Sequence, residues 1–145
     1  MGLSTENKST FLIQLHKSIE DFANNNANHI FQGRLNQLIT YPPNGGLTKE
    51  ESDSLEQLKG KEQLKSALRK IFASTTADVF FDIFNIIDGT ADPDPGLGEW
   101  TEVMLVDKPE NLGDEVEFLH DEFYATYWDW KEKRQNTNWK LDTLQ

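Results

Sequence analysis

The sequence contains no cysteine, which excludes disulfide bonds, thiolate metal sites and cysteine nucleophiles. It has no run of about 18 consecutive apolar residues, which excludes a membrane-spanning helix. The opening residues MGLSTENKST lack a basic segment followed by an apolar one, so we expect no secretory signal. Glu6 stands where a myristoylation signal requires Ser or Thr. We therefore expect a cytoplasmic protein without a lipid anchor.

Basic residues are also few, because 14 Lys and Arg stand against 25 Asp and Glu, for a net charge of −11. The imbalance lies in residues 88–130, where 13 carboxylates accompany one cation, Lys108, for a net charge of −12. The rest of the chain holds 12 acids and 13 bases, a net charge of +1. Binding to a phosphate backbone requires Lys and Arg, so this composition excludes a nucleic-acid partner and favours a basic protein or cations.

The same acidic stretch is rich in large aromatic side chains. It contains three of the four tryptophans and all but one of the tyrosines. Carboxylates attract a basic partner at long range, and aromatic residues are the usual anchors of a contact once it forms. The sequence therefore predicts a partner-binding surface made of Asp88, Asp92, Asp94, Glu99, Trp100, Glu117, Asp121, Glu122, Tyr124 and Trp128.

Helical periodicity is clear in the first third of the chain. Apolar residues recur at helical spacing over residues 5–23, and the polar run Asn24–Asn26 is expected to end that helix. Residues 30–39 predict a second, shorter helix. Thr48 and Glu51 have the spacing of a capping box, which predicts that a further helix begins there.

A longer helical pattern starts at Lys61 and is expected to break at Ser74–Thr76. It resumes over Val79–Ile87, which is apolar on most sides and is predicted to be the central buried helix. A buried strand is the alternative for this segment, because Val, Ile and Phe also favour sheets.

The last part of the chain begins with a loop over residues 88–98, where Pro and Gly are frequent. Residues 100–107 are β-rich and predict a small β-element, and residues 114–134 predict a final helix. The length and the 37% apolar content suit a single globular domain over residues 1–145, with 135–145 as a loose tail. We expect a mainly α fold of about five helices.

Two patterns of carboxylates suggest metal binding or catalysis as an alternative function. Asp88, Thr90, Asp92, Asp94 and Glu99 occupy positions 1, 3, 5, 7 and 12 of a calcium loop, but proline takes the place of its essential glycine. The alternative is an exposed acidic turn. Residues 117–121 include a Glu-x-x-His, which is half of a di-iron ligand set, and the alternative there is a solvated helix face.

The sequence offers no complete catalytic constellation. His120 and Asp121 are neighbours on the predicted helix, so their side chains point about 100° apart and the carboxylate is poorly placed to orient the imidazole. A G-x-S-x-G nucleophile elbow is absent. We therefore expect a non-enzymatic protein with no bound metal or cofactor, and keep a small metal-binding protein or enzyme using residues 88–99 or 117–121 as the alternative.

The stretches VFFDIFNIIDGTADPDPGLGEWTEVMLVDK and EFLHDEFYATYWDWKEKR resemble small acidic immunity proteins of bacterial polymorphic and contact-dependent toxin systems. The resemblance implies a protein that binds and blocks a toxin made by its own cell. Such inhibitors often place acidic patches against basic nuclease sites, which agrees with the charge of residues 88–130. A homodimer formed through the aromatic C-terminal helix is a further possibility.

Overall fold

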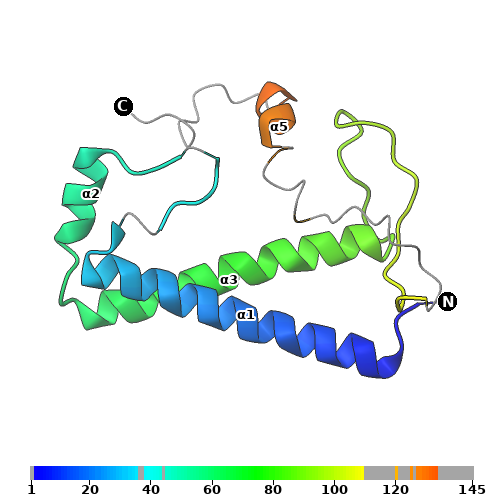
Figure 1. Ribbon diagram of the computed structural model, residues 1–145, viewed down its shortest axis with the longest axis horizontal. Helices are drawn as coiled ribbons and strands as arrows, with labels where there is room; N and C mark the ends of the chain where they lie inside the picture. Colours follow the sequence, from blue (N-terminus) through cyan, green and yellow to red (C-terminus); the bar gives the residue numbers. More distant parts are fainter. Residues whose placement is uncertain are drawn as a thin grey trace. The chain divides into compact units, whose positions relative to one another are not determined.

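The computed structural model describes residues 2–35, 38–43, 45–109, 120, 125 and 127–133 (Figure 1). Its helices in these ranges are α1 (Thr5–Gln32), α2 (Lys49–Glu56), α3 (Glu62–Ile87) and α5 (Tyr127–Lys133). The described residues are thus mainly helical, as predicted, but they contain neither five helices nor a strand. None of the described helices is both long enough and apolar enough to cross a membrane.

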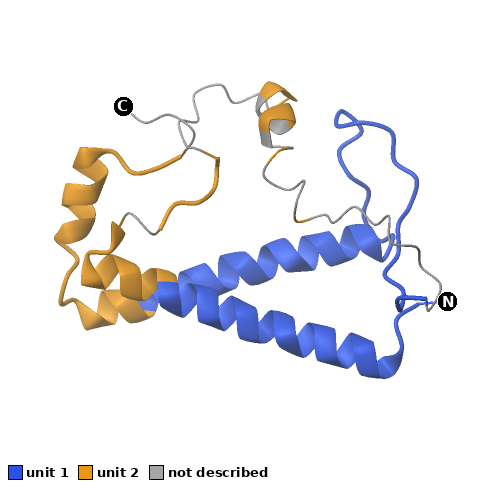
Figure 2. Cartoon of the chain, in the orientation of Figure 1, with its two compact units in different colours: residues 1–25, 67–112 blue, residues 26–66, 113–145 orange. Residues whose placement is uncertain are grey.

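The chain divides into two compact units (Figure 2). Unit 1 consists of Met1–Asn25 and Ala67–Leu112, and unit 2 consists of Asn26–Ser66 and Gly113–Gln145. Within unit 1, α1 and α3 run in opposite directions, and the ring of Phe11 meets the ring of Phe84 edge to face with 6.2 Å between centroids.

Helix α1 does not end at Asn24–Asn26 as predicted, but continues to Gln32. Two buried alanines, Ala23 and Ala27, flank the asparagines. Alanine has the highest helix propensity, and the burial of this face outweighs the modest cost of Asn in a helix.

The helix predicted over residues 30–39 is also wrong, because residues 30–32 form the last turn of α1. Helix α1 ends before Gly33, which has φ of 69°, a value that glycine adopts without a steric cost. The N–H of Arg34 closes the end by donating to the carbonyl of His29 at 2.9 Å.

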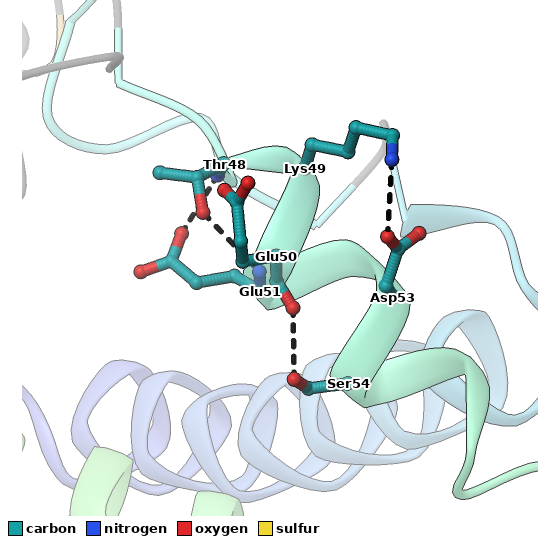
Figure 3. Close-up of polar contacts among 6 residues, drawn as sticks. All are labelled: Thr48, Lys49, Glu50, Glu51, Asp53 and Ser54. Carbon is teal, nitrogen blue, oxygen red and sulfur yellow. Dashed lines mark hydrogen bonds and ion pairs between the residues drawn. The ribbon is translucent and has the colours of Figure 1, made fainter.

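Helix α2 begins where the capping box predicts (Figure 3). The backbone N–H of Glu51 donates to Thr48 Oγ1 at 3.2 Å, and the N–H of Thr48 donates to Glu51 Oε2 at 2.7 Å. These two bonds satisfy donors that the first helical turn leaves without partners. The prediction is therefore confirmed at the level of individual atoms.

Helix α3 runs without a break through Ser74–Thr76, so the predicted interruption is wrong. Thr76 Oγ1 donates to the carbonyl of Phe72 at 2.8 Å, and its hydroxyl is satisfied inside the helix. The helix ends beside Gly89, at φ of 69°, as predicted. The alternative of a strand over Val79–Ile87 is wrong as well.

The prediction that Val79–Ile87 is the central buried helix is wrong, because no described residue of α3 is buried. The buried side chains belong instead to α1 and the segment after it: Ile19, Ala23, Ala27, Ile30, Phe31, Leu35 and Pro42. In unit 1, α3 turns Phe80 and Phe84 toward the hollow that it forms with α1. Ile71, Val79 and Ile83 are exposed on the same helix, and Val79 is 52% exposed.

The β-element predicted over residues 100–107 is absent from the described part of the chain. A strand requires a neighbouring strand with which to exchange backbone hydrogen bonds. The described residues supply no such neighbour to this segment, although its composition favours a strand. The segment is irregular and forms no strand ladder.

Candidate functional site

The candidate site is built from the segment that follows α3 in unit 1, residues 88–107, which we call the acidic segment. Its start is tied to the helix end, because Thr90 Oγ1 donates to the carbonyl of Asn85 at 3.1 Å. A turn follows, in which Asp94 Oδ1 accepts the N–H of Gly96 at 2.8 Å and the Asp94 carbonyl accepts the N–H of Leu97 at 2.9 Å. The chain reverses direction there and returns toward the N-terminus (Figure 1).

The far end of the acidic segment is held by Asp107. Its Oδ1 accepts the backbone N–H of Ser4 at 3.1 Å and the side-chain amide of Asn7 at 2.8 Å. These donors, with Asn7 contributing most, hold the pKa of Asp107 below its ordinary value because they stabilise the charged form. The acidic segment is therefore anchored at both ends within unit 1.

Between these anchors the carboxylates face solvent. Asp88, Asp92, Asp94 and Glu99, all predicted site residues, are exposed, and so is Glu102. In the part of the chain that the structure describes, none of them forms an ion pair. With Asp107 and Lys108, residues 88–108 hold six carboxylates and one cation, a net charge of −5.

Trp100, predicted as an aromatic anchor, lies on the acidic segment and is 39% exposed. Leu97, Val103, Met104 and Val106 are exposed on the same segment. The first five predicted site residues thus lie along one exposed segment, which also carries apolar residues that the prediction did not include.

The other five predicted site residues belong to the part of the chain that forms unit 2. Trp128 is exposed on α5 in unit 2. Glu117, Asp121, Glu122 and Tyr124 lie outside the described residues.

Metal binding by the acidic segment receives no support. Among the residues that the structure describes, no three His, Asp or Glu side chains gather closely enough to hold a metal ion. The oxygens at positions 1, 3, 5, 7 and 12 counted from Asp88 thus lie along an open loop. The alternative ligand set at residues 117–121 falls outside the described residues except for His120.

A second feature of unit 1 was missed by the sequence reasoning. Two adjoining hollows, of about 640 and 410 Å³, lie between α1 and α3 and share Leu12, Phe81 and Phe84. We call them together the apolar groove. Its remaining lining residues are Gly2, Leu3, Lys8, Phe11, Leu15, His16, Ile19, Ala77, Asp78, Phe80, Asn85, Ile87, Asp88, Met104 and Leu105.

Large apolar side chains in this groove are open to solvent. Phe81 is 67% exposed and Met104 is 66% exposed, although both line the groove. The sequence carried one signal of this feature. A helix that is apolar on most sides needs contacts on more than one face, and α1 covers only one face of α3 in unit 1.

The comparisons with known proteins add no relative: no family model, no curated protein and no solved structure matches this chain. The acidic segment and the apolar groove are the features of the described residues that bear on function. Both belong to unit 1, and Asp88, Met104 and Leu105 are common to the two.

Proposed function

We propose that this chain is a non-enzymatic interaction protein that binds a basic protein through the acidic segment. The observation that carries the proposal is a row of exposed carboxylates without ion pairs among the described residues, set beside exposed Trp100 and Leu97. Carboxylates of like charge held on one segment repel one another. A partner with Lys and Arg side chains relieves that repulsion.

The two kinds of side chain have different roles in this proposal. The charges raise the rate of encounter and select a basic partner, an effect that salt weakens. The apolar and aromatic neighbours, Trp100 among them, supply most of the affinity once water is expelled. The more specific form of the proposal is an immunity protein that covers the basic surface of a toxin and so blocks it.

The test compares two variants of equal charge. Asp92→Asn with Asp94→Asn neutralises two carboxylates of the acidic segment, and Asn at position 94 keeps the oxygen that accepts the Gly96 N–H. Glu20→Gln with Glu132→Gln removes the same charge from exposed positions of α1 and α5. Immobilised wild-type and variant proteins are loaded with source-cell extract and eluted with a salt gradient.

We expect a basic protein to elute from the Asp92/Asp94 variant at clearly lower salt than from the wild type and the control variant. Each ion pair that is lost makes the affinity for the partner less dependent on salt concentration. Equal elution from all three columns would overturn the proposal. For the immunity form, the purified chain should abolish the toxic activity of the captured protein, and an unaffected activity would reduce the proposal to binding alone.

A further inference from the structure

The floor of the apolar groove suits an apolar helix face. Its two hollows meet at Leu12, Phe81 and Phe84, so the floor continues from one end to the other. On α3, Ala77, Phe81 and Phe84 lie on one face at spacings of three and four residues. The groove therefore runs along the two helices.

The rims of the groove carry charge. Asp78 lines it from α3 and Asp88 from the start of the acidic segment, whereas Lys8 and His16 line it from α1. The acidic segment begins at Asp88 and adds further carboxylates at that end. One rim is thus acidic, and an occupant needs cations on the side that faces α3.

The dimensions fit a short helix. From Asp78 to Asp88 a helical rise of 1.5 Å per residue corresponds to about 15 Å, or about three helical turns. A partner helix of that length presents apolar side chains at i, i+4 and i+7 on one face. Such anchors can enter the two hollows on either side of their junction at Leu12, Phe81 and Phe84.

Other occupants fit less well. A small apolar ligand needs a pocket that encloses most of its surface, whereas Phe81 on the floor is 67% exposed. An anionic membrane is repelled by the carboxylates of Asp78 and Asp88. A second copy of this chain carries the same net charge of −11, which opposes its approach.

We infer that the apolar groove is the docking site for an amphipathic helix of the partner, with basic residues along the edge that faces α3. The inference rests on the proposed function, because it assigns the part of a basic partner that makes the apolar contact. In this arrangement the acidic segment attracts the partner, and the groove binds the apolar side chains of the partner helix.

The probe is a synthetic peptide of about 18 residues, made of Leu, Lys and Gln, with Leu at helical spacing and a fluorescent label. One control peptide has the same composition in scrambled order, and another has Glu in place of Lys. Binding to the full chain is measured by fluorescence anisotropy over a range of salt concentrations. Sedimentation of the protein alone and flotation with neutral-lipid vesicles accompany it.

The protein variants isolate the groove. Phe81→Ser removes the floor residue, and its matched control is Phe22→Ser on α1, which is 65% exposed and does not line the groove. Asp78→Asn with Asp88→Asn neutralises the acidic rim. Its control is again Glu20→Gln with Glu132→Gln.

We expect Phe81→Ser to weaken peptide binding about tenfold with an unchanged dependence on salt. We expect the rim variant to reduce the salt dependence, and both controls to bind as the wild type does. Equal binding of the scrambled peptide, or equal loss from Phe22→Ser, would overturn the inference. So would self-association or vesicle binding that depends on Phe81 while the peptide fails to bind.

The outcomes also separate the inference from the proposed function. If the peptide does not bind, but capture of a basic protein still depends on Asp92 and Asp94, then only the groove assignment is wrong. If the peptide binds through Phe81, but capture of a basic protein does not depend on Asp92 and Asp94, then the groove assignment stands and the acidic-segment proposal is wrong.

Discussion

Asn7 donates its side-chain amide to Asp107 Oδ1 at 2.8 Å, across a separation of 100 residues in the chain. The same oxygen accepts the backbone N–H of Ser4. This relationship joins the start of α1 to the end of the acidic segment inside unit 1. Met104 and Leu105, which precede Asp107, line the apolar groove. The groove is therefore lined by the acidic segment as well as by α1 and α3.

The first prediction concerns the pH dependence of this contact. Because Asn7 and Ser4 lower the pKa of Asp107, the folded protein keeps the carboxylate charged at pH values where the unfolded chain protonates it. The resulting stabilisation is complete above the ordinary Asp pKa of about 3.9, and it is lost as the pH falls through the lowered pKa of the folded state.

In Asp107→Asn this pH dependence should disappear, while the oxygen that accepts both hydrogen bonds is kept. The measurement is the urea midpoint of wild type and variant between about pH 2 and pH 6. The difference between them should shrink toward the acid end. A difference that is constant over the whole range would show that Asp107 does not contribute through its charge.

The second prediction concerns the capping box of α2. Replacement of Thr48 by Ala removes the acceptor of the Glu51 N–H and should destabilise the helix by about 0.5–2 kcal/mol. Hydrogen exchange of the Ser52–Leu55 amides reports this local opening. Thr40→Ala is the control, since Thr40 is exposed outside the helices. Unchanged exchange in Thr48→Ala would show that the cap is not formed in solution.

The third prediction concerns the glycine that ends α1. Gly33 has φ of 69°, and a Cβ there would lie 2.6 Å from Lys59 Cε and 2.9 Å from Glu56 Oε1. Gly60 has φ of 76° with no atom within 4 Å of such a Cβ. Each Gly→Ala variant should lose about 1 kcal/mol of unfolding free energy, because alanine disfavours a positive φ. Gly33→Ala should lose more than Gly60→Ala, because its methyl group also meets side-chain atoms.

The excess at Gly33 is attributed to the Lys59–Glu56 ion pair, whose atoms must move to admit the methyl group. In a background that carries both Glu56→Ala and Lys59→Ala, the two glycine substitutions should therefore cost the same free energy of unfolding. An excess that survives in this background would assign it to the backbone of α1 and not to the ion pair.

The fourth prediction concerns the aromatic contact between α1 and α3. Phe84 is half-buried and meets Phe11 edge to face, whereas Phe81 is mostly exposed. Phe84→Ala should lower the free energy of unfolding by more than Phe81→Ala does. A double-mutant cycle over Phe11 and Phe84 should give a coupling of about 0.5–1.5 kcal/mol. Strict additivity would mean that the two rings do not interact in solution.

Local interactions account for the features that were predicted correctly. The start of α2 depends on Thr48 and Glu51, three residues apart, and the end of α3 depends on Asp88–Gly89. Both involve bonds within one turn of chain, so residue type and spacing are sufficient evidence. The concentration of carboxylates in residues 88–107 is likewise a property of composition, and their exposure follows from the cost of burying charge.

Only the tertiary structure decided the rest. Burial of Ala23 and Ala27 allows α1 to continue past its asparagines. Residues 100–107 form no strand, because the described residues contain no strand with which they could pair. The exposure of Phe81 depends on which face of α3 meets α1, and periodicity does not reveal that when most faces are apolar. Contacts between residues far apart in sequence, such as Asn7 with Asp107, set these outcomes, because no local pattern encodes which distant groups will meet.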